Sequence, residues 1–254
     1  PLIAEQLGGA SETWDPAACS LIPPTDGMAT KLTWLGHGSW AVETAGHKLL
    51  LDPFLDDSPT APVKAADVEA DFILVSHGHA DHVADVEAIA KRTGALVIGM
   101  FEVCQWFQGR GVEHTLGMNL GGASQQPFGR VQLTLAHHSS TMPDGSPGGN
   151  PAGFLLRLDG PTIYFACDTA LFSDMELIGR AGLDLAVLPI GDLYTMGPED
   201  SIEAVKLLSP KKVAPAHYNT WPPIAQDAAA WAEAVRQQTS AEPIVLEPGQ
   251  SFSL

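Results

Sequence analysis

The sequence predicts an α/β fold in which two mixed β-sheets are covered by helices. Three observations predict it. Short runs rich in β-branched and aromatic residues alternate with turn signals from residue 28 onward. Several of these runs are continuously apolar, which is typical of strands buried on both faces. Helical periodicity follows only some of the strands, so two mixed sheets fit better than a strict alternation of strand and helix.

The first half of the chain begins with a predicted antiparallel meander. Its strands cover 31–35, 41–43 and 48–51, and glycine-containing turns separate them. The apolar strand Phe72–Val75 follows and leads into a polar loop over 76–82. The remaining elements of this half are a helix over 83–92 closed by Gly94, a strand over 96–99 and a helix over 102–108 ended by Gly109.

The second half repeats the rhythm of strand, loop and helix. A strand over 131–136 precedes a loop rich in proline and glycine, 141–151, and a hairpin is expected to turn at Asp159-Gly160. Pro198 opens a helix, because proline suits the first helical turn. The other predicted elements are strands over 154–158, 162–166, 185–190, 212–215 and 244–246 and helices over 175–181, 199–208 and 227–238.

The N-terminal residues 1–27 read differently from the rest. They contain paired glycines and several prolines, with no sustained period of 2 or 3.6. They also lack the cationic start and apolar run of a secretory signal. We expect an N-terminal extension over 1–27 and one domain over 28–254.

The composition limits the possible partners. The chain has 30 Asp+Glu against 13 Lys+Arg, a formal net charge of −17. Nucleic acids and anionic membranes require a basic face, so we expect neither as a partner. Three widely spaced cysteines form neither a disulfide framework nor a CxxC metal site, which favours a cytoplasmic protein. A small-molecule substrate is the remaining expectation.

The most informative segment is the polar loop after the buried strand, which reads Ser76-His77-Gly78-His79-Ala80-Asp81-His82. Imidazoles and carboxylates are the ligands that zinc, iron, nickel and manganese accept. In a tight loop His77 and His79 can point one way while Asp81 and His82 point another, which is enough to hold two ions. A solvated histidine-rich loop is the alternative, and Asp81 and the preceding buried strand weigh against it.

Further ligands are expected at later strand ends, because one loop cannot complete two metal sites. The candidates that directly follow predicted strands are His137, His138, Asp168 and His217. Each has an ordinary interpretation when taken singly, such as a core histidine or, for Asp168, a helix N-cap. Strand ends are where α/β folds gather their sites, so together these residues favour a metal centre.

The segment His77 to His82 resembles the HxHxDH signature of the metallo-β-lactamase fold, and the later His, Asp and His follow in that superfamily's order. Other phrases resemble small metal-dependent hydrolases related to L-ascorbate-6-phosphate lactonase: Leu32-Thr33-Trp34-Leu35-Gly36-His37-Gly38-Ser39, Leu51-Asp52-Pro53-Phe54-Leu55, Leu188-Pro189-Ile190-Gly191-Asp192, Met196-Gly197-Pro198-Glu199-Asp200 and Pro215-Ala216-His217-Tyr218-Asn219-Thr220. The resemblance covers about residues 30–250. It implies a four-layer αββα sandwich of two mixed sheets flanked by helices.

The resemblance also implies a ligand set. It assigns His77, His79 and His138 to a first metal, Asp81, His82 and His217 to a second, and Asp168 to both as a bridge. We choose His138 over its neighbour because the family's phrase ends in His-Ser-Ser, here His138-Ser139-Ser140. His137 stays as a rival.

The expected activity is that of a binuclear hydrolase. Two divalent ions, zinc first with manganese, iron or nickel as alternatives, would supply a metal-bound hydroxide to a small-molecule ester, lactone or phosphoester. Asp81 or Asp168 is expected to relay a proton to the leaving group. His37, in a glycine-flanked turn, is a candidate for the substrate side of the pocket, or an ordinary turn histidine. Asp52 is expected to grip a ligating imidazole or the backbone of the metal loop.

Two departures from the family's pattern qualify the resemblance. The chain reads Phe165-Ala166-Cys167-Asp168-Thr169 where the family often has His-Ala-Gly-Asp-Thr, and Leu116 stands where it often has histidine before Gly-Met-Asn. Both leave the ligand set intact. Competing functions are a nuclease or phosphodiesterase of the same superfamily, which the net charge disfavours, and a binding protein that the metals only stabilise. Family members often associate, so a homo-oligomer is compatible with the resemblance.

Overall fold

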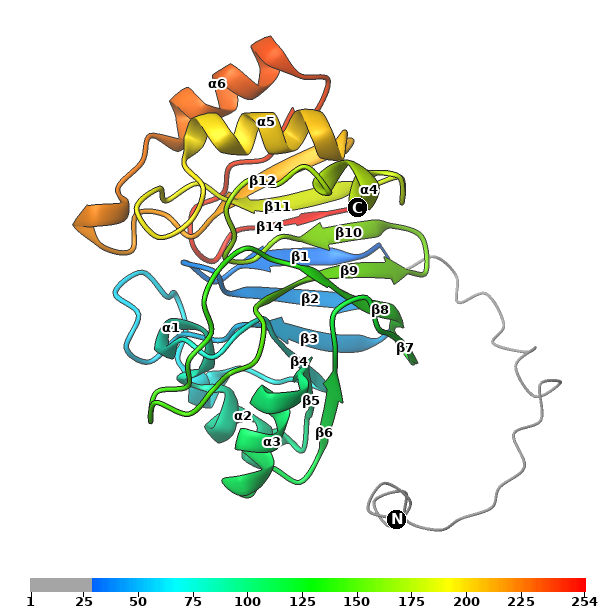
Figure 1. Ribbon diagram of the computed structural model, residues 1–254, viewed down its shortest axis with the longest axis vertical. Coiled ribbons are helices and arrows are strands. Elements are labelled where there is room, and N and C mark those ends of the chain that lie inside the picture. The colour runs from blue at the N-terminus through cyan, green and yellow to red at the C-terminus, as the bar shows by residue number, and fades with distance from the viewer. Residues whose placement is uncertain (1–28) are drawn as a thin grey trace, which may run out of the picture.

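The computed structural model describes residues 29–254, and the expected extension over 1–27 lies outside the described residues. The described chain forms two seven-stranded sheets with helices against them, which confirms the predicted metallo-β-lactamase-like fold (Figure 1). The division into an extension and one domain stays a prediction.

The first sheet contains the predicted N-terminal meander. In spatial order its strands are β14 (Ser251–Ser253), β1 (Lys31–Trp34), β2 (Trp40–Thr44), β3 (His47–Leu51), β4 (Phe72–Val75), β5 (Leu96–Met100) and β6 (Thr115–Met118). Pairing is antiparallel from β14 to β3 and parallel from β3 to β6. The sheet is therefore mixed, as predicted.

The second sheet repeats this arrangement in the opposite chain order. Its strands are β13 (Glu242–Pro243), β12 (Lys212–Ala216), β11 (Leu185–Pro189), β10 (Thr162–Phe165), β9 (Ala152–Leu158), β8 (Gly129–Leu135) and β7 (Ala123–Gln126). Pairing is parallel from β13 to β10 and antiparallel from β10 to β7. Each sheet thus has a parallel half and an antiparallel half.

The helices lie against the parallel halves of the sheets. They are α1 (Ala80–Val83), α2 (Val86–Thr93) and α3 (Phe101–Gly109) beside the first sheet, and α4 (Met175–Gly179), α5 (Pro198–Leu208) and α6 (Ala228–Gln238) beside the second (Figure 1). Their ends follow the sequence signals. Gly94 ends α2 in the left-handed region at φ 74°, and Asp227 caps α6 by accepting hydrogen bonds from two backbone N–H groups.

The core lies between the two sheets. Trp40 of β2 faces Phe165 of β10 with ring centroids 6.2 Å apart, and Phe72 of β4 faces Phe128 at 4.7 Å. All four side chains are buried. Burial of such large apolar surfaces supplies the main driving force for packing one sheet on the other.

Three predictions of local structure were wrong or incomplete. Residues 244–246 form no strand; the last strand is β14, which pairs with β1 across the whole length of the chain. The strands β6 and β7 were missed, because glycine interrupts the short apolar run of β6 and β7 is mostly polar. The polar loop 76–82 ends in the short helix α1. Within residues 29–254, no helix is long and apolar enough to cross a membrane.

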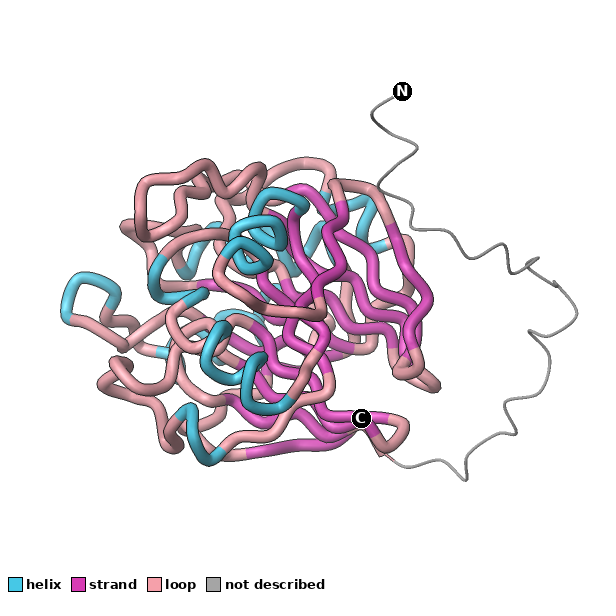
Figure 2. Tube along the Cα trace, turned by 90° about the horizontal axis from the view of Figure 1, so that it is seen from below, coloured by secondary structure: helices cyan, strands magenta, loops and turns pink. Residues whose placement is uncertain are grey.

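The strands deliver their following loops to one side of the molecule. Figure 2 shows long loops extending from one end of the strands, and the same side is at the left of Figure 1. Because the carboxyl ends of parallel strands meet at one edge of a sheet, the loops after β4, β10 and β12 converge there.

Candidate metal centre

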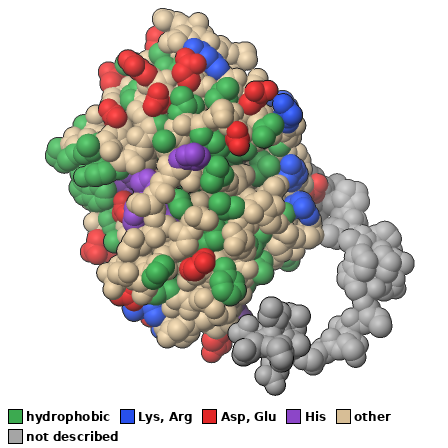
Figure 3. All heavy atoms as spheres, in the orientation of Figure 1, with side chains coloured by type: hydrophobic (Ala, Val, Ile, Leu, Met, Phe, Trp, Pro, Cys, Tyr) green, Lys and Arg blue, Asp and Glu red, His purple; other side chains and the backbone are tan. Residues whose placement is uncertain are grey.

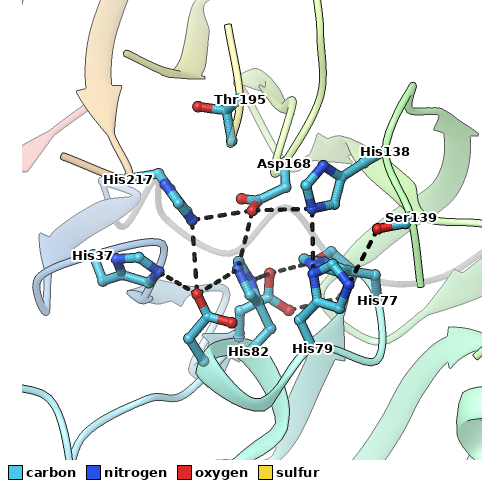
Figure 4. Close-up of polar contacts among 12 residues, drawn as sticks. His37, His77, His79, His82, His138, Ser139, Asp168, Thr195 and His217 are labelled. Atoms are coloured by element: carbon cyan, nitrogen blue, oxygen red, sulfur yellow. Dashed lines mark hydrogen bonds and ion pairs between the residues drawn. The ribbon is translucent and has the colours of Figure 1, made fainter. Parts of the chain in front are cut away.

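Histidine and aspartate side chains from both sheets converge on one point between the loops (Figure 4). The first sheet contributes residues that follow β1 and β4, and the second contributes residues that follow β8, β10 and β12. The side chains brought together are His37, His77, His79, Asp81, His82, His138, Asp168 and His217. Every residue expected at the metal centre therefore lies in this cluster, and their roles as ligands stay predictions.

Three of these histidines form what we call the first group: His77, His79 and His138. Nδ1 of His79 lies 2.9 Å from Nε2 of His77 and 3.2 Å from Nε2 of His138. Nδ1 of His79 and the Nε2 atoms of His77 and His138 thus point at one another. A proton on one of these nitrogens cannot supply a hydrogen bond to every lone pair in the group. Ser76 Oγ, 2.9 Å from Nδ1 of His77, and Ser139 Oγ, 3.3 Å from Nε2 of His79, contact the outward-facing nitrogens.

The second group consists of Asp81, His82 and His217. Their ligand atoms, together with one of His37, all lie within 4.8 Å of one another. Nε2 of His82 and Nε2 of His217 are each 3.8 Å from Oδ2 of Asp81. The two histidines are buried, while Asp81 is 26% exposed.

Asp168 lies between the two groups. Its Oδ2 is 3.0 Å from Nε2 of His217, 3.4 Å from Nε2 of His82 and 3.6 Å from Nε2 of His138. Burial alone would raise the pKa of this carboxyl, but His217 and His82 hold the pKa of Asp168 well below its usual range. A single ionised oxygen therefore faces members of both groups.

The donor set fits divalent cations. Nδ1 of His217 is buried and has no hydrogen-bond partner among the described residues, and Nε2 of His82 and of His217 face carboxylate oxygens without the geometry of a hydrogen bond. A buried polar atom without a partner costs about 1–3 kcal/mol, so such atoms normally have a ligand or a water. Neutral imidazole nitrogens and carboxylate oxygens gathered within 4.8 Å are the ligand types that zinc and related ions accept.

Asp52 supports the centre from behind, as predicted. Its Oδ2 accepts a hydrogen bond from Nδ1 of His82 at 2.9 Å, and its Oδ1 accepts one from the backbone N–H of Ser76 at 2.8 Å. The proton on Nδ1 of His82 is therefore held by Asp52, and Nε2 is the ring nitrogen directed at the second group, where a metal ion would displace its proton. The Asp52 carboxylate therefore fixes both the orientation of the His82 ring and the position of the backbone at Ser76, where the metal loop begins.

His37, expected on the substrate side of the pocket or as an ordinary turn histidine, contacts Asp81. Its side chain is fully buried, Nε2 lies 2.9 Å from Oδ2 of Asp81, and Nδ1 lies 2.7 Å from Oγ1 of Thr220. Burial and the neighbouring His217 lower the pKa of His37 to about 4, so the ring is neutral. A carboxylate can only accept, so Nε2 donates to Asp81 and Thr220 donates to Nδ1. His37 therefore orients Asp81, and its role toward a substrate stays a prediction.

Asp81 is held as a carboxylate by this contact. Burial would raise its pKa, but the hydrogen bond from His37 and the charge on His82 lower the pKa of Asp81 below its usual range. Its partial exposure leaves it reachable from solvent.

Backbone strain concentrates at the centre. His37, Asp52, Cys167 and His217 have φ values of 50°, 44°, 54° and 53°, in the left-handed region that non-glycine residues rarely adopt. Each such residue costs about 1 kcal/mol, and residues of this kind gather at functional sites. The glycine that the resemblance places at the position of Cys167 would adopt this conformation without strain.

The two adjacent histidines are packed differently. His138 points into the first group, whereas His137 is exposed and stacks on Phe172 with ring centroids 5.0 Å apart. Cys167 contributes no nucleophile, because burial raises the pKa of its thiol well above its usual range. Tyr218 is buried and stacks on Trp34 at 5.2 Å, so it supports the loop of His217 from below.

Sequence reasoning missed Thr220 and Ser140. Ser140 Oγ accepts a hydrogen bond from the backbone N–H of Gly78 at 3.1 Å and so ties the loop of His138 to the loop of His77. Gly78 is required there, because a Cβ would meet the Met142 sulfur at 2.5 Å. Thr220 and Ser140 both lie in segments that resemble the family. Nothing in those segments shows which polar residue contacts which candidate ligand.

Known proteins share both the sequence and the fold. Residues 31–217 match the beta-lactamase superfamily domain. A UPF0173 metal-dependent hydrolase of Pelotomaculum thermopropionicum is 48% identical over 88% of this chain and 100% of its own length. A UPF0173 metal-dependent hydrolase of Thermus thermophilus is 45% identical over 88% of this chain and 99% of its own.

Solved structures agree. Igni18, a metallo hydrolase from the archaeon Ignicoccus hospitalis, is 34% identical with a TM-score of 0.82, over 89% of this chain and 99% of its own. The metallo-beta-lactamase fold protein YhfI of Bacillus subtilis, at 15% identity and a TM-score of 0.68, covers 89% of this chain and 100% of its own and shares the fold. The chain therefore belongs to the UPF0173 family of metal-dependent hydrolases, within the metallo-beta-lactamase superfamily.

Proposed function

We propose that this hydrolase binds two divalent ions, zinc first, and cleaves a small-molecule ester, lactone or phosphoester. The first group would hold one ion and the second group the other, with Asp168 as the bridge. The observation that carries the proposal is the position of Asp168, whose single oxygen faces nitrogens of both groups at 3.0–3.6 Å.

The ions would supply Lewis-acid polarisation of the scissile carbonyl or phosphoryl oxygen and would lower the pKa of a water toward neutrality. The chain's own residues do the positioning. Asp52 and His37 orient His82 and Asp81 through the hydrogen bonds described above. Asp81 is the partly exposed carboxylate of the centre and is held ionised, so it is placed to take a proton from water and pass it to the leaving group.

The test combines metal analysis with a hydrolysis screen. Wild type, His79→Ala and Asp81→Ala are purified, their metal content is measured by mass spectrometry, and each is assayed on lactones, carboxylic esters and phosphodiesters. We expect two ions per wild-type chain, one fewer in each variant, and hydrolysis that chelation abolishes and metal restores.

His114→Ala is the matched control, because this histidine is exposed and contacts neither group. It should keep the metal content and rate of the wild type. Activity that survives chelation in Asp81→Ala would refute the mechanism. A wild type that holds two ions and hydrolyses nothing in the panel would favour a non-catalytic, metal-stabilised binding protein.

A further inference from the structure

Exposed apolar side chains lie on two loops that adjoin the metal centre. Leu193 and Tyr194, on the loop 190–197, are 64% and 57% exposed, and Trp221, on the loop 217–227, is 36% exposed. Of the seven large apolar side chains exposed in the described part of the chain, three belong to this set. We call Leu193, Tyr194 and Trp221 the apolar rim.

The loop 190–197 is pinned at both ends to segments that carry candidate ligands. Gly191 packs on the backbone carbonyl of His217, where a Cβ would collide. At the other end the N–H of Met196 donates to the carbonyl of Thr169, next to Asp168, at 2.9 Å. Between these anchors the chain closes on itself through Thr195 N–H and the Asp192 carbonyl at 2.7 Å. The tip of this loop, which carries Leu193 and Tyr194, is therefore held beside the second group.

The other loop is joined to the first. Gln226 Nε2 donates to the carbonyl of Gly191 at 3.3 Å, and the ring of Trp221 lies 5.0 Å from the ring of His37 and 5.9 Å from that of Phe54. Figure 3 shows hydrophobic side chains grouped at the left edge of this face, beside histidine side chains. The apolar side chains of the rim are exposed to water next to a site, and the residues around them are ordered. Such a surface is typical of one that a ligand covers.

The charges around the centre limit the classes of substrate that it can bind. Six segments surround it, and their sequences contain no lysine and no arginine: 35–39, 76–83, 136–151, 166–174, 190–197 and 217–227. The nearby segment after β3 contains Lys64, whose Nζ is bonded to the Asp56 carbonyl. Phosphate and carboxylate groups on a substrate are normally bound by arginine or lysine.

We propose that the substrate is an uncharged carboxylic ester or lactone with a hydrophobic substituent, and that the apolar rim binds this substituent. The proposal rests on the hydrolase function above and selects among its substrate classes. The rim removes apolar surface from water when the substituent docks, which favours longer chains. A substrate with an additional anionic group would meet the acidic loops of the centre without a counter-charge.

The test compares matched substrates and rim variants. Wild type and the double variant Leu193→Ser/Tyr194→Ser, both loaded with zinc, are assayed on p-nitrophenyl acetate, p-nitrophenyl hexanoate and bis(p-nitrophenyl) phosphate. We expect wild-type kcat/KM to be at least about tenfold higher for the hexanoate than for the acetate, because each added methylene contacts the rim. The double variant should lose this preference through a rise in KM for the hexanoate, and it should keep the metal content of the wild type.

Leu177→Ser is the matched control. Leu177 is 55% exposed and lines a groove of about 580 Å³ between β8, β9 and α4. This variant should keep the preference for the hexanoate. A loss in Leu177→Ser, retention in the rim variant, or faster cleavage of the phosphodiester than of the hexanoate would each overturn the proposal.

A binding measurement separates this proposal from the hydrolase function. The neutral fluorophore N-phenyl-1-naphthylamine is titrated into wild type, the rim variant and Leu177→Ser. If no ester in the panel is cleaved, the hydrolase proposal for esters fails, and the rim is judged by binding alone. At least about tenfold weaker binding in the rim variant only would support a hydrophobic ligand at the rim, whereas equal binding in all three proteins would refute it.

Discussion

The two ligand groups of the centre are built in different ways. In the first group the histidine rings contact one another, and serine hydroxyls contact their other nitrogens. In the second group each of two ligands is backed by a buried partner: Asp52 behind His82 and His37 behind Asp81. His217, Asp52 and His37 also adopt left-handed backbone conformations.

This difference shows which parts of the chain position the candidate ligands of each group. Each group takes two candidate ligands from the segment after β4, so one local motif places His77 and His79 in the first group and Asp81 and His82 in the second. The second group depends on side chains and strained turns from distant parts of the chain, so the fold must form before the ligands are aligned. Preorganised partners of this kind typically change metal affinity or activity by 10–100-fold when removed.

Removing the shared residue should have the largest effect. Asp168→Ala takes the one carboxylate away from both groups, so we expect both ions to bind more weakly and kcat/KM to fall at least about a thousandfold, roughly 4 kcal/mol of barrier. Metal content after dialysis and ester hydrolysis measure this. Asp174→Ala, an exposed carboxylate on the same segment, should change neither. Two ions bound with unchanged affinity in Asp168→Ala would refute the bridging assignment.

The buried support of the second group should make the metal-free protein sensitive to acid. Burial lowers the pKa of His37 to about 4, against about 6.5 in the unfolded chain. The unfolded chain then binds more protons between these values, so stability is fully present above pH 6.5 and falls as the pH falls toward 4. We expect His37 alone to account for about 2 kcal/mol of lost stability between pH 7.5 and 5.

Urea unfolding of chelator-treated protein at the two pH values measures this loss. His82, whose pKa is raised by Asp168 and Asp52 despite burial, works in the opposite direction, so the comparison is made with His37→Gln. That variant should lose less stability on acidification than the wild type does. An equal loss in both proteins would contradict the assignment of a buried, neutral His37.

Weakening the hydrogen bond between Asp52 and His82 should change the metal affinity of the second group and leave that of the first group unchanged. In Asp52→Asn the amide does not supply the charged acceptor that holds the proton on Nδ1 of His82, so the ion of the second group should bind about 10–100-fold more weakly. The ion of the first group should be unaffected. Competition with a chromophoric chelator resolves the two affinities, and Asp57→Asn, an exposed neighbour, serves as the control. Equal weakening of both ions would remove the distinction between the groups.

The smallest effect is expected from Thr220. Thr220→Val removes the donor to Nδ1 of His37 and allows the other ring tautomer, so Asp81 is held less well. We expect a fall of a few-fold in kcat with KM unchanged, about 1 kcal/mol for one hydrogen bond, and recovery in Thr220→Ser. Thermal unfolding should show both variants folded. Failure of serine to restore kcat would mean that the threonine methyl, not its hydroxyl, matters.

Much of this centre could be predicted from local sequence. The run from His77 to His82 after an apolar strand predicted a metal loop, and Asp168 and His217 were found because each follows a strand that ends at the same edge. The choice of His138 came from the phrase His-Ser-Ser. Packing of His137 on Phe172 is the physical reason for it, and no local pattern shows that contact.

The sequence by itself determined the fold class, the order of most strands and helices, and the residue types available to a metal centre. These follow from short-range properties: apolar periodicity, turn residues and ligand chemistry. The tertiary structure alone decided that His37 faces Asp81, that Thr220 sets its tautomer, and that β14 closes the first sheet on β1. Each of these contacts joins residues at least 44 positions apart, and such pairs are set by how whole sheets pack.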